Sequence, residues 1–156
     1  METTIIRLSP HFTIAEFTAS ATADRLDIDN SMPERLLPAA RLLAAHALEP
    51  VRERFGTTRL NSGYRCLALN RAVGSSDGSQ HRLGEAADLR VPGVENRLVA
   101  EFIQDECQFD QLILENVRAG VPGSGWVHVS YRAGRLRRQV LTKIVGERGY
   151  RQGLVA

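Results

Sequence analysis

The stretch SQHRLGEAADL, residues 79–89, is the most informative part of this sequence for the fold and for a ligand site. His81 follows a segment rich in glycine and serine, and Asp88 lies seven positions later inside an apolar strand. Burying a carboxylate is unfavourable unless a cation or a network of hydrogen-bond donors compensates its charge. A divalent metal bound by imidazole and carboxylate provides this compensation, and Gly84 allows the tight turn that brings loop and strand together. The stretch therefore predicts a metal site, with a capping or hydrogen-bonded aspartate as the alternative.

A second histidine lies in the segment WVHVSY, residues 126–131, where polar and apolar residues alternate strictly. Alternation of this kind is typical of a strand with one buried face, so Val127 and Val129 face one side and His128 the other. A catalytic zinc site needs three protein ligands and an open position for water. His128 is the candidate for the third ligand. Trp126 shares its face and is either a core residue or part of a substrate-binding wall.

A carboxylate is expected on the same face as His128. In the preceding strand, Leu112 and Leu114 share one face, and Glu115 lies on the opposite one. If the two strands pair with their apolar faces on the core, Glu115 lies beside His128, where a general base would be useful. Asp110 shares the leucine face, and Glu85, next to Gly84, is expected to be exposed. Both are weaker candidates.

Helices and strands follow one another in an order typical of an α+β protein. Apolar positions recur every three or four residues over Pro33–Phe55, where Pro50 is expected to kink or split the helix, and over Val94–Cys107. A short helix over Ile14–Phe17 follows a cap at Thr13 or Ser9, and residues 18–30 are expected to form a loop. Short strands are expected at residues 59–63, 86–91, 109–115, 126–131 and 139–144. We expect one domain over residues 1–156, a small antiparallel sheet packed against helices.

Composition excludes several classes of protein. Of 156 residues, 43% are hydrophobic and 24% are charged, which is typical of a globular domain that needs no disulfides. Cys66 and Cys107 are too few and too far apart to form a disulfide framework. The net charge of +2 predicts no nucleic-acid partner, and no apolar run approaches the ~18 residues of a membrane span. We expect a monomer that binds neither nucleic acid nor membrane.

Basic residues gather near the C-terminal end of the sequence, at Arg132, Arg135, Arg137, Arg138 and Lys143. Charged residues often protect the edge strand of a sheet from unwanted pairing. We therefore expect a solvated strand edge here, with weak attraction to an anionic polymer such as cell wall as the alternative.

Three segments together resemble the family of zinc D-alanyl-D-alanine carboxypeptidases and peptidoglycan endopeptidases. Residues 79–88 match its pattern Ser-x-His-x-x-Gly-x-Ala-x-Asp, Ser62–Arg65 resembles its Ser-Gly-(Phe/Tyr)-Arg element, and residues 126–129 resemble its third-ligand strand. The segments occur in the family's order, and the resemblance covers roughly residues 8–131. The sequence is most similar to small phage and prophage members, in which a strand like FDQLI, residues 109–113, precedes the ligand strand.

The resemblance implies a fold of the Hedgehog and DD-peptidase type, a zinc ion, and a role for each matching residue. His81, Asp88 and His128 would bind Zn²⁺, and Arg65 would bind the substrate carboxylate or polarise its carbonyl. Ser79 would contact the substrate or fix its loop. The implied activity is hydrolysis of the peptide stem of bacterial peptidoglycan, at D-Ala-D-Ala or at a bond such as L-Ala-D-Glu.

One departure from the family pattern concerns the catalytic base. Many members carry Asp or Glu three positions before the last histidine, whereas this sequence has Gly125 there. Glu115 is therefore our candidate base. Two alternatives stay open: a catalytically silent metal-binding domain in a phage structural or docking role, and a metal-dependent hydrolase of another amide or ester.

The N-terminal residues predict no export by a secretory route. No basic segment followed by an apolar run occurs in residues 1–12, so no signal peptide is expected. We expect a protein made in the cytoplasm that reaches the cell wall only after release by other means, as in a phage or prophage setting.

Overall fold

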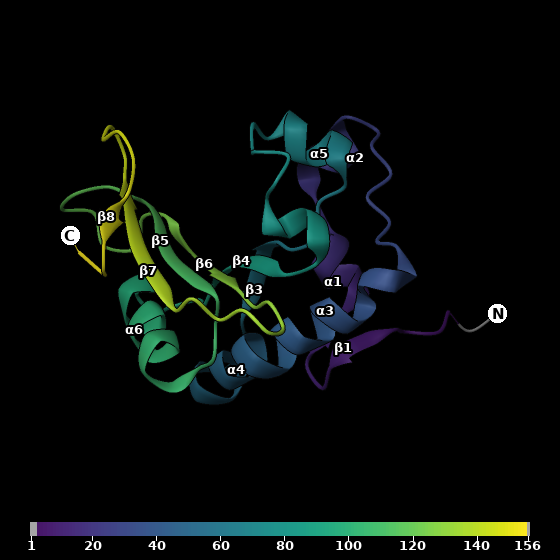
Figure 1. Ribbon diagram of the computed structural model, residues 1–156, viewed down its shortest axis with the longest axis horizontal. Helices are drawn as coiled ribbons and strands as arrows, with labels where there is room; N and C mark the ends of the chain where they lie inside the picture. Colours follow the sequence, from purple (N-terminus) through teal and green to yellow (C-terminus); the bar gives the residue numbers. More distant parts are fainter. Residues whose placement is uncertain (1–2, 156) are drawn as a thin grey trace.

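The structure is a computed structural model that describes residues 3–155. Its centre is a six-stranded sheet (Figure 1). The strands lie side by side in the order β3 (Arg59–Ser62), β4 (Ala86–Arg90), β6 (Trp126–Ser130), β5 (Gln111–Val117), β7 (Gln139–Ile144) and β8 (Arg151–Gln152). The expected strands are present, and the α+β fold class is confirmed.

The sheet is mixed and not wholly antiparallel as expected, because β7 runs parallel to β5. Strand β6 is antiparallel to β5 and therefore ends beside the start of β5, where Val129 lies opposite Leu112. Residues 131–138 then cross this end of β5, and β7 begins with Gln139 opposite Gln111. Because this crossing is short and stays at one end of the sheet, β7 starts beside the start of β5 and runs parallel to it.

One continuous helical segment covers one face of the sheet. It comprises η1 (Glu34–Leu36), α3 (Leu37–Leu43), the π-helical turn η2 (Ala44–Leu48) and α4 (Glu49–Phe55). Pro50 was expected to kink or split this helix. The α-helix is divided into α3 and α4, but the chain stays helical through the π turn between them. In this turn the Glu49 N–H donates to the Ala44 carbonyl, an adjustment that fits a proline, which has no N–H to donate, at the next position.

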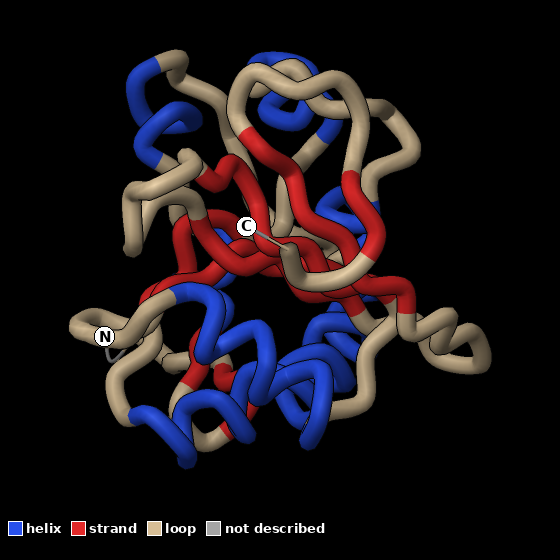
Figure 2. The backbone as a smooth tube through the Cα atoms, turned by 90° about the vertical axis from the view of Figure 1, so that its left-hand side faces the viewer, coloured by secondary structure: helices blue, strands red, loops and turns tan. Residues whose placement is uncertain are grey.

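The hydrophobic core lies between these helices and the sheet. Helix α6 (Asn96–Glu106) packs beside α4 under β5 and β6, and these helices form a layer below the strands in Figure 2, where shorter helices lie above the strands. The core side chains from the sheet include Ala87, Leu89, Leu112, Leu114, Val127 and Val129. Since side chains alternate along a strand, the residues between them point to the opposite face. That face carries the candidate site.

The N-terminal part packs against the opposite end of the long helical segment. It contains the hairpin β1 (Arg7–Ser9) and β2 (Phe12–Thr13), then α1 (Ile14–Thr18), which the expected Thr13 cap begins. The loop expected at 18–30 is partly wrong, because Ser20 caps a short helix, α2 (Ala21–Arg25).

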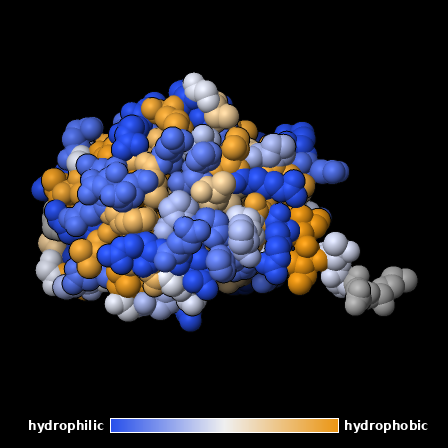
Figure 3. Space-filling model, turned by 90° about the horizontal axis from the view of Figure 1, so that it is seen from below, coloured by the Kyte–Doolittle hydropathy of each residue, from blue (hydrophilic) through white to orange (hydrophobic). Residues whose placement is uncertain are grey.

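Seen from below, the surface in Figure 3 mixes hydrophilic and hydrophobic residues. Within residues 3–155, no helix has the length and apolar character needed to cross a membrane.

Candidate metal centre and active site

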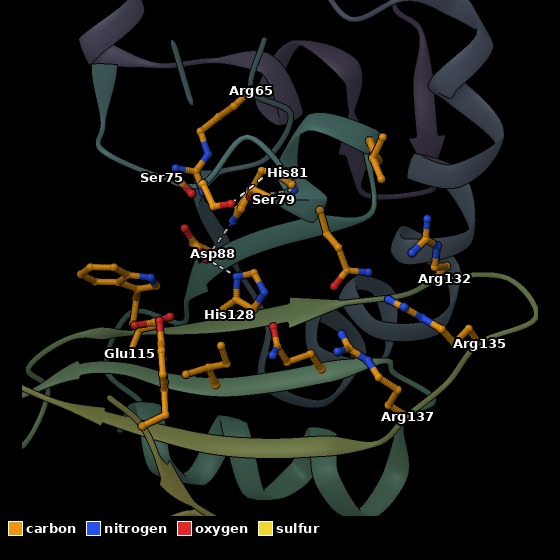
Figure 4. A pocket seen from close by; sticks show the side chains of 18 residues that line it. Arg65, Ser75, Ser79, His81, Asp88, Glu115, His128, Arg132, Arg135 and Arg137 are labelled. Carbon is orange, nitrogen blue, oxygen red and sulfur yellow. Dashed lines mark hydrogen bonds and ion pairs between the residues drawn. The ribbon is translucent and has the colours of Figure 1, made fainter. Parts of the chain in front are cut away.

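The uncovered face of the sheet forms the floor of a cleft of about 650 Å³ (Figure 4). Its opposite wall is built by the turn before α5 (Leu67–Ala72) and by residues 75–83, including the 3₁₀ helix η3 (Gln80–Leu83). The cleft brings together every site residue expected from the sequence, which are Arg65, Ser79, His81, Asp88, Glu115, Trp126 and His128.

His81, Asp88 and His128 lie close together, with their possible ligand atoms within 4.8 Å of one another. We call these three residues the metal cluster. Asp88 and His128 lie directly opposite each other in the β4–β6 ladder, and Asp88 Oδ1 is 2.9 Å from His128 Nδ1. The same oxygen is 3.4 Å from His81 Nε2. Donors around a tetrahedral zinc ion, with bonds of about 2.1 Å, are separated by roughly 3.4 Å. Two imidazoles and one carboxylate in this arrangement fit a catalytic zinc site.

The ring of His81 is held with one nitrogen directed at the cluster. Its Nδ1 lies 2.7 Å from the Gly63 carbonyl, so Nδ1 donates a hydrogen bond and Nε2 keeps a free lone pair. His81 is buried, and burial lowers the pKa of its imidazole, which favours the neutral form that a metal requires. Burial alone would raise the pKa of Asp88, but the two histidines outweigh burial and keep it well below its usual range.

The turn that carries Arg65 is clamped through its backbone. The Arg65 N–H donates to the His81 carbonyl at 3.1 Å, which ties this turn to the metal cluster. The Asn30 side chain holds both neighbours, because its amide nitrogen donates to the Tyr64 carbonyl and its oxygen accepts from the Cys66 N–H. Sequence reasoning missed Asn30, since no local pattern links it to a turn more than thirty residues away.

The Arg65 side chain reaches into the cleft above Asp88 (Figure 4). Its Nε is buried and has no hydrogen-bond partner within the described part of the chain. Burial lowers the pKa of the guanidinium, although the charge of Asp88 opposes this, and arginine stays protonated in any case. A desolvated cation with an unpaired donor is suited to bind an anionic group of a ligand.

Ser79 fixes the loop that precedes the first histidine. It caps η3, and its hydroxyl accepts a hydrogen bond from the His81 N–H at 3.3 Å. The positive φ of Gly84, +69°, ends this helical turn and starts the approach to β4. The contact supports the loop-fixing alternative for Ser79, which also lines the cleft.

Glu115 lies on the cleft face, as strand parity predicts. Ile113 is directly opposite His128 in the β5–β6 ladder, and Glu115 is opposite the half-buried Trp126. Burial raises the pKa of the Glu115 carboxyl; the negative charge of Asp88 adds to this, and His128 partly offsets it. A carboxylate whose pKa is raised toward neutrality accepts protons more readily, as a general base must.

Gly125 has no room for any side chain. Its φ is +74°, and a Cβ there would lie 1.9 Å from the Glu115 carbonyl oxygen. Asn96, at the start of α6, donates to the carbonyls of Ser124 and Gly125 and so holds this loop in position. An acidic side chain at position 125 is therefore sterically excluded.

The two other carboxylates considered as the general base, Asp110 and Glu85, both pair with arginines. Asp110 is fully buried and pairs with Arg137 and Arg135, and Gln80 also donates to it. Burial alone would raise its pKa, but hydrogen bonds from Arg137 and Gln80 lower it to about 2. Glu85 was expected to be exposed, which is wrong, because its side chain is 12% exposed and pairs with Arg132.

The basic cluster expected to be a solvated strand edge lies elsewhere. Arg132, Arg135 and Arg137 belong to the crossing between β6 and β7 and line the cleft. Arg138 donates to the Gln104 and Cys107 carbonyls at the end of α6.

Tyr150, between β7 and β8, also lines the cleft and was not anticipated. Cys66 and Cys107 are free thiols, half-buried and buried.

Comparison with known proteins adds a family to this geometry. Residues 10–130 match the family model described as Peptidase M15. A search of curated proteins found no significant match. The matched range contains the three candidate ligands, Arg65 and Glu115.

Proposed function

The chain belongs to the peptidase M15 family, and on that premise we propose that it is a zinc-dependent peptidase acting on bacterial peptidoglycan. Its substrate is the peptide stem, cut at D-Ala-D-Ala or at an internal bond such as L-Ala-D-Glu. The observation that carries this proposal is the convergence of three possible metal donors, the half-buried carboxylate of Glu115 and an arginine with an unpaired Nε in one cleft. The zinc peptidase-like domain spans residues 1–156 and acts as a monomer.

His81, Asp88 and His128 are the residues that would hold the zinc ion. A bound zinc ion supplies Lewis acidity, which polarises a peptide carbonyl and lowers the pKa of water toward about 7. The contact between His81 Nδ1 and the Gly63 carbonyl keeps the ring oriented for binding.

Glu115 is the proposed general base. It takes a proton from the attacking water and then gives that proton to the amine that leaves when the peptide bond breaks. Its position opposite Trp126, one strand away from His128, supports this role.

The remaining cleft residues bind the substrate. Arg65 holds a carboxylate of the stem peptide with two parallel hydrogen bonds, because its guanidinium is desolvated and its Nε is unpaired. Trp126 forms a wall beside the scissile bond, and Ser79 holds the loop that carries His81.

The biological setting that we propose is a phage or prophage. The support is the order of strand motifs, in which residues 109–113 precede the ligand strand as in small phage and prophage members of similar sequence. In this setting the protein acts on the wall after release by other means.

The proposal is tested by incubating the zinc-loaded protein with stem pentapeptides and measuring the masses of the products. Release of D-alanine identifies a carboxypeptidase, and release of L-alanine identifies an endopeptidase. Glu115→Gln should lower kcat by about 10² or more, because it removes the general base and keeps the size of the side chain. The matched change Glu53→Gln, at an exposed carboxylate on α4 outside the cleft, should have little effect on kcat.

Two results would count against this function. An active Glu115→Gln protein would show that another group is the base. Zinc binding without cleavage of any wall fragment would favour the catalytically silent domain.

A further inference from the structure

Three arginines form one side of the cleft, on the crossing between β6 and β7. We call Arg132, Arg135 and Arg137 the arginine rim. In Figure 4 the rim and Arg65 lie on opposite sides of the metal cluster, with His128 and Asp88 between them. The cleft therefore has a cationic group at each end.

The rim is held in place by carboxylates behind it. Asp110, which is fully buried, accepts from the backbone N–H and Nε of Arg137 through Oδ1. Its Oδ2 accepts from Arg137 Nη2, Arg135 Nη2 and Gln80 Nε2. Glu85 pairs with Arg132 at 3.5 Å. These contacts hold the arginines, and the carboxylates that make them are buried or nearly so, with Asp110 0% and Glu85 12% exposed.

Each rim arginine is partly exposed to solvent. The side chains of Arg132, Arg135 and Arg137 are 39%, 48% and 40% exposed. Arg135 uses one nitrogen toward Asp110, and a guanidinium carries five N–H donors. An arginine already held by a buried carboxylate loses less conformational entropy when it binds a further anion.

The charges that line the cleft favour an anionic ligand. Four arginines line it, against the two carboxylates Asp88 and Glu115, and Asp88 belongs to the metal cluster. Asp110 and Glu85 pair with the rim arginines from behind and balance much of this charge, so the excess belongs to the lining, where a ligand meets the guanidinium groups. A concave surface with such an excess attracts anionic substrates and discriminates against cationic ones.

We propose that the arginine rim is a second anion-binding subsite, which holds a substrate carboxylate other than the one bound by Arg65. The inference rests on the proposed function and specifies its substrate as an acidic peptide with at least two carboxylates. One carboxylate is bound at each end of the cleft, and the scissile bond lies between them at the metal cluster.

The test measures binding, so that it does not depend on turnover. Calorimetry with zinc-loaded Glu115→Gln protein compares a stem pentapeptide whose internal carboxylates are free with the same peptide whose internal carboxylates are amidated. The free acid should bind about tenfold more tightly, as expected for charge-assisted hydrogen bonds at a partly exposed site. The preference should weaken as salt is raised.

The rim is then altered by Arg132→Gln and Arg135→Gln together. Arg137 is kept because it makes most of the contacts to Asp110. The tenfold preference should fall to about one. A matched control, Arg90→Gln with Arg118→Gln, removes two exposed arginines outside this cleft and should keep the preference. If the glutamine pair unfolds, Arg132→Lys with Arg135→Lys retains the charge and should show an intermediate preference.

Several results would overturn the inference. An unchanged preference in the rim variants, equal binding of the two peptides to the parent, or no binding of either peptide would each do so. Loss of binding to whole anionic walls with unchanged peptide preference would assign the rim to a wall polymer. Discrimination in binding without cleavage by the parent would overturn the peptidase function and leave the subsite standing.

Discussion

Replacing Gly125 with alanine tests whether the loop before β6 excludes an acid at the usual place of the base. The φ of Gly125 is +74°, and an added Cβ would lie 1.9 Å from the Glu115 carbonyl oxygen and 3.0 Å from the Asn116 carbonyl carbon and oxygen. All three contacts are with backbone atoms, so a change of rotamer cannot relieve them.

The expected cost follows from two contributions. A non-glycine residue with left-handed backbone dihedrals costs about 1–2 kcal/mol. Restoring an ordinary contact of about 3.5 Å requires β5 and the loop to separate by about 1.5 Å, and such overpacking costs about 1–3 kcal/mol. Gly125→Ala should therefore lower the free energy of unfolding by about 2–5 kcal/mol. For a chain of this size the melting temperature should fall by about 2–4 °C for each kcal/mol.

The assay is urea denaturation with a parallel melting curve, and Gly123→Ala is the matched control. Gly123 lies in the same loop with φ +81°, but a Cβ there would contact nothing within 4 Å. It should show the backbone strain alone, about 1–2 kcal/mol. Equal destabilisation by the two variants would refute the steric reasoning. A stable Gly125→Asp protein that rescues the activity of Glu115→Gln would also refute it.

Three further changes have defined outcomes. The purified protein should bind about one zinc per chain, and His81→Ala, Asp88→Ala and His128→Ala should each lose it; full zinc retention in all three by metal analysis would contradict the ligand assignment. Arg65→Lys should keep fold and zinc but lower kcat/KM at least tenfold, because an ammonium cannot form two parallel hydrogen bonds to a carboxylate; unchanged kinetics beside an unchanged melting curve would make Arg65 structural. Asp110→Asn should cost about 2 kcal/mol near neutral pH. Since the pKa of Asp110 is about 2 in the fold and about 3.9 unfolded, its stabilisation is complete above about pH 4 and lost as pH falls toward 2, and urea titrations of the variant should lack this loss.

Strand parity was sufficient to predict the floor of the cleft. Alternation in residues 111–115 and 126–130 separates core residues from site residues, and the pairing of Ile113 with His128 brings the two site faces together. This works because a single buried face fixes the register of a strand. Asp88 was conspicuous for a different reason, because β4 is buried on both faces and a buried carboxylate needs a compensating charge or donor.

Other features depend on long-range geometry that no local pattern carries. The direction of β7 is set by where β6 ends, so a string of arginines that resembles an exposed edge becomes one side of the cleft. Likewise, Asn30 and Gln80 act on partners about thirty residues away along the chain. Hydrophobic periodicity reports which face is buried, but not which segments a polar side chain will reach.

The glycine at position 125 and the placement of Glu115 depend on each other. The Glu115 carbonyl oxygen occupies the space that a Cβ at residue 125 would need, so β5 and the loop before β6 can approach this closely only with glycine there. The same approach brings the side chain of Glu115 opposite Trp126, the residue that follows Gly125, at the entrance to the ligand strand. A wider separation would admit an acid at 125 and move Glu115 away from His128. The close approach that excludes an acid at position 125 thus positions a carboxylate from the neighbouring strand, and the cleft keeps this carboxylate on one side of the metal cluster.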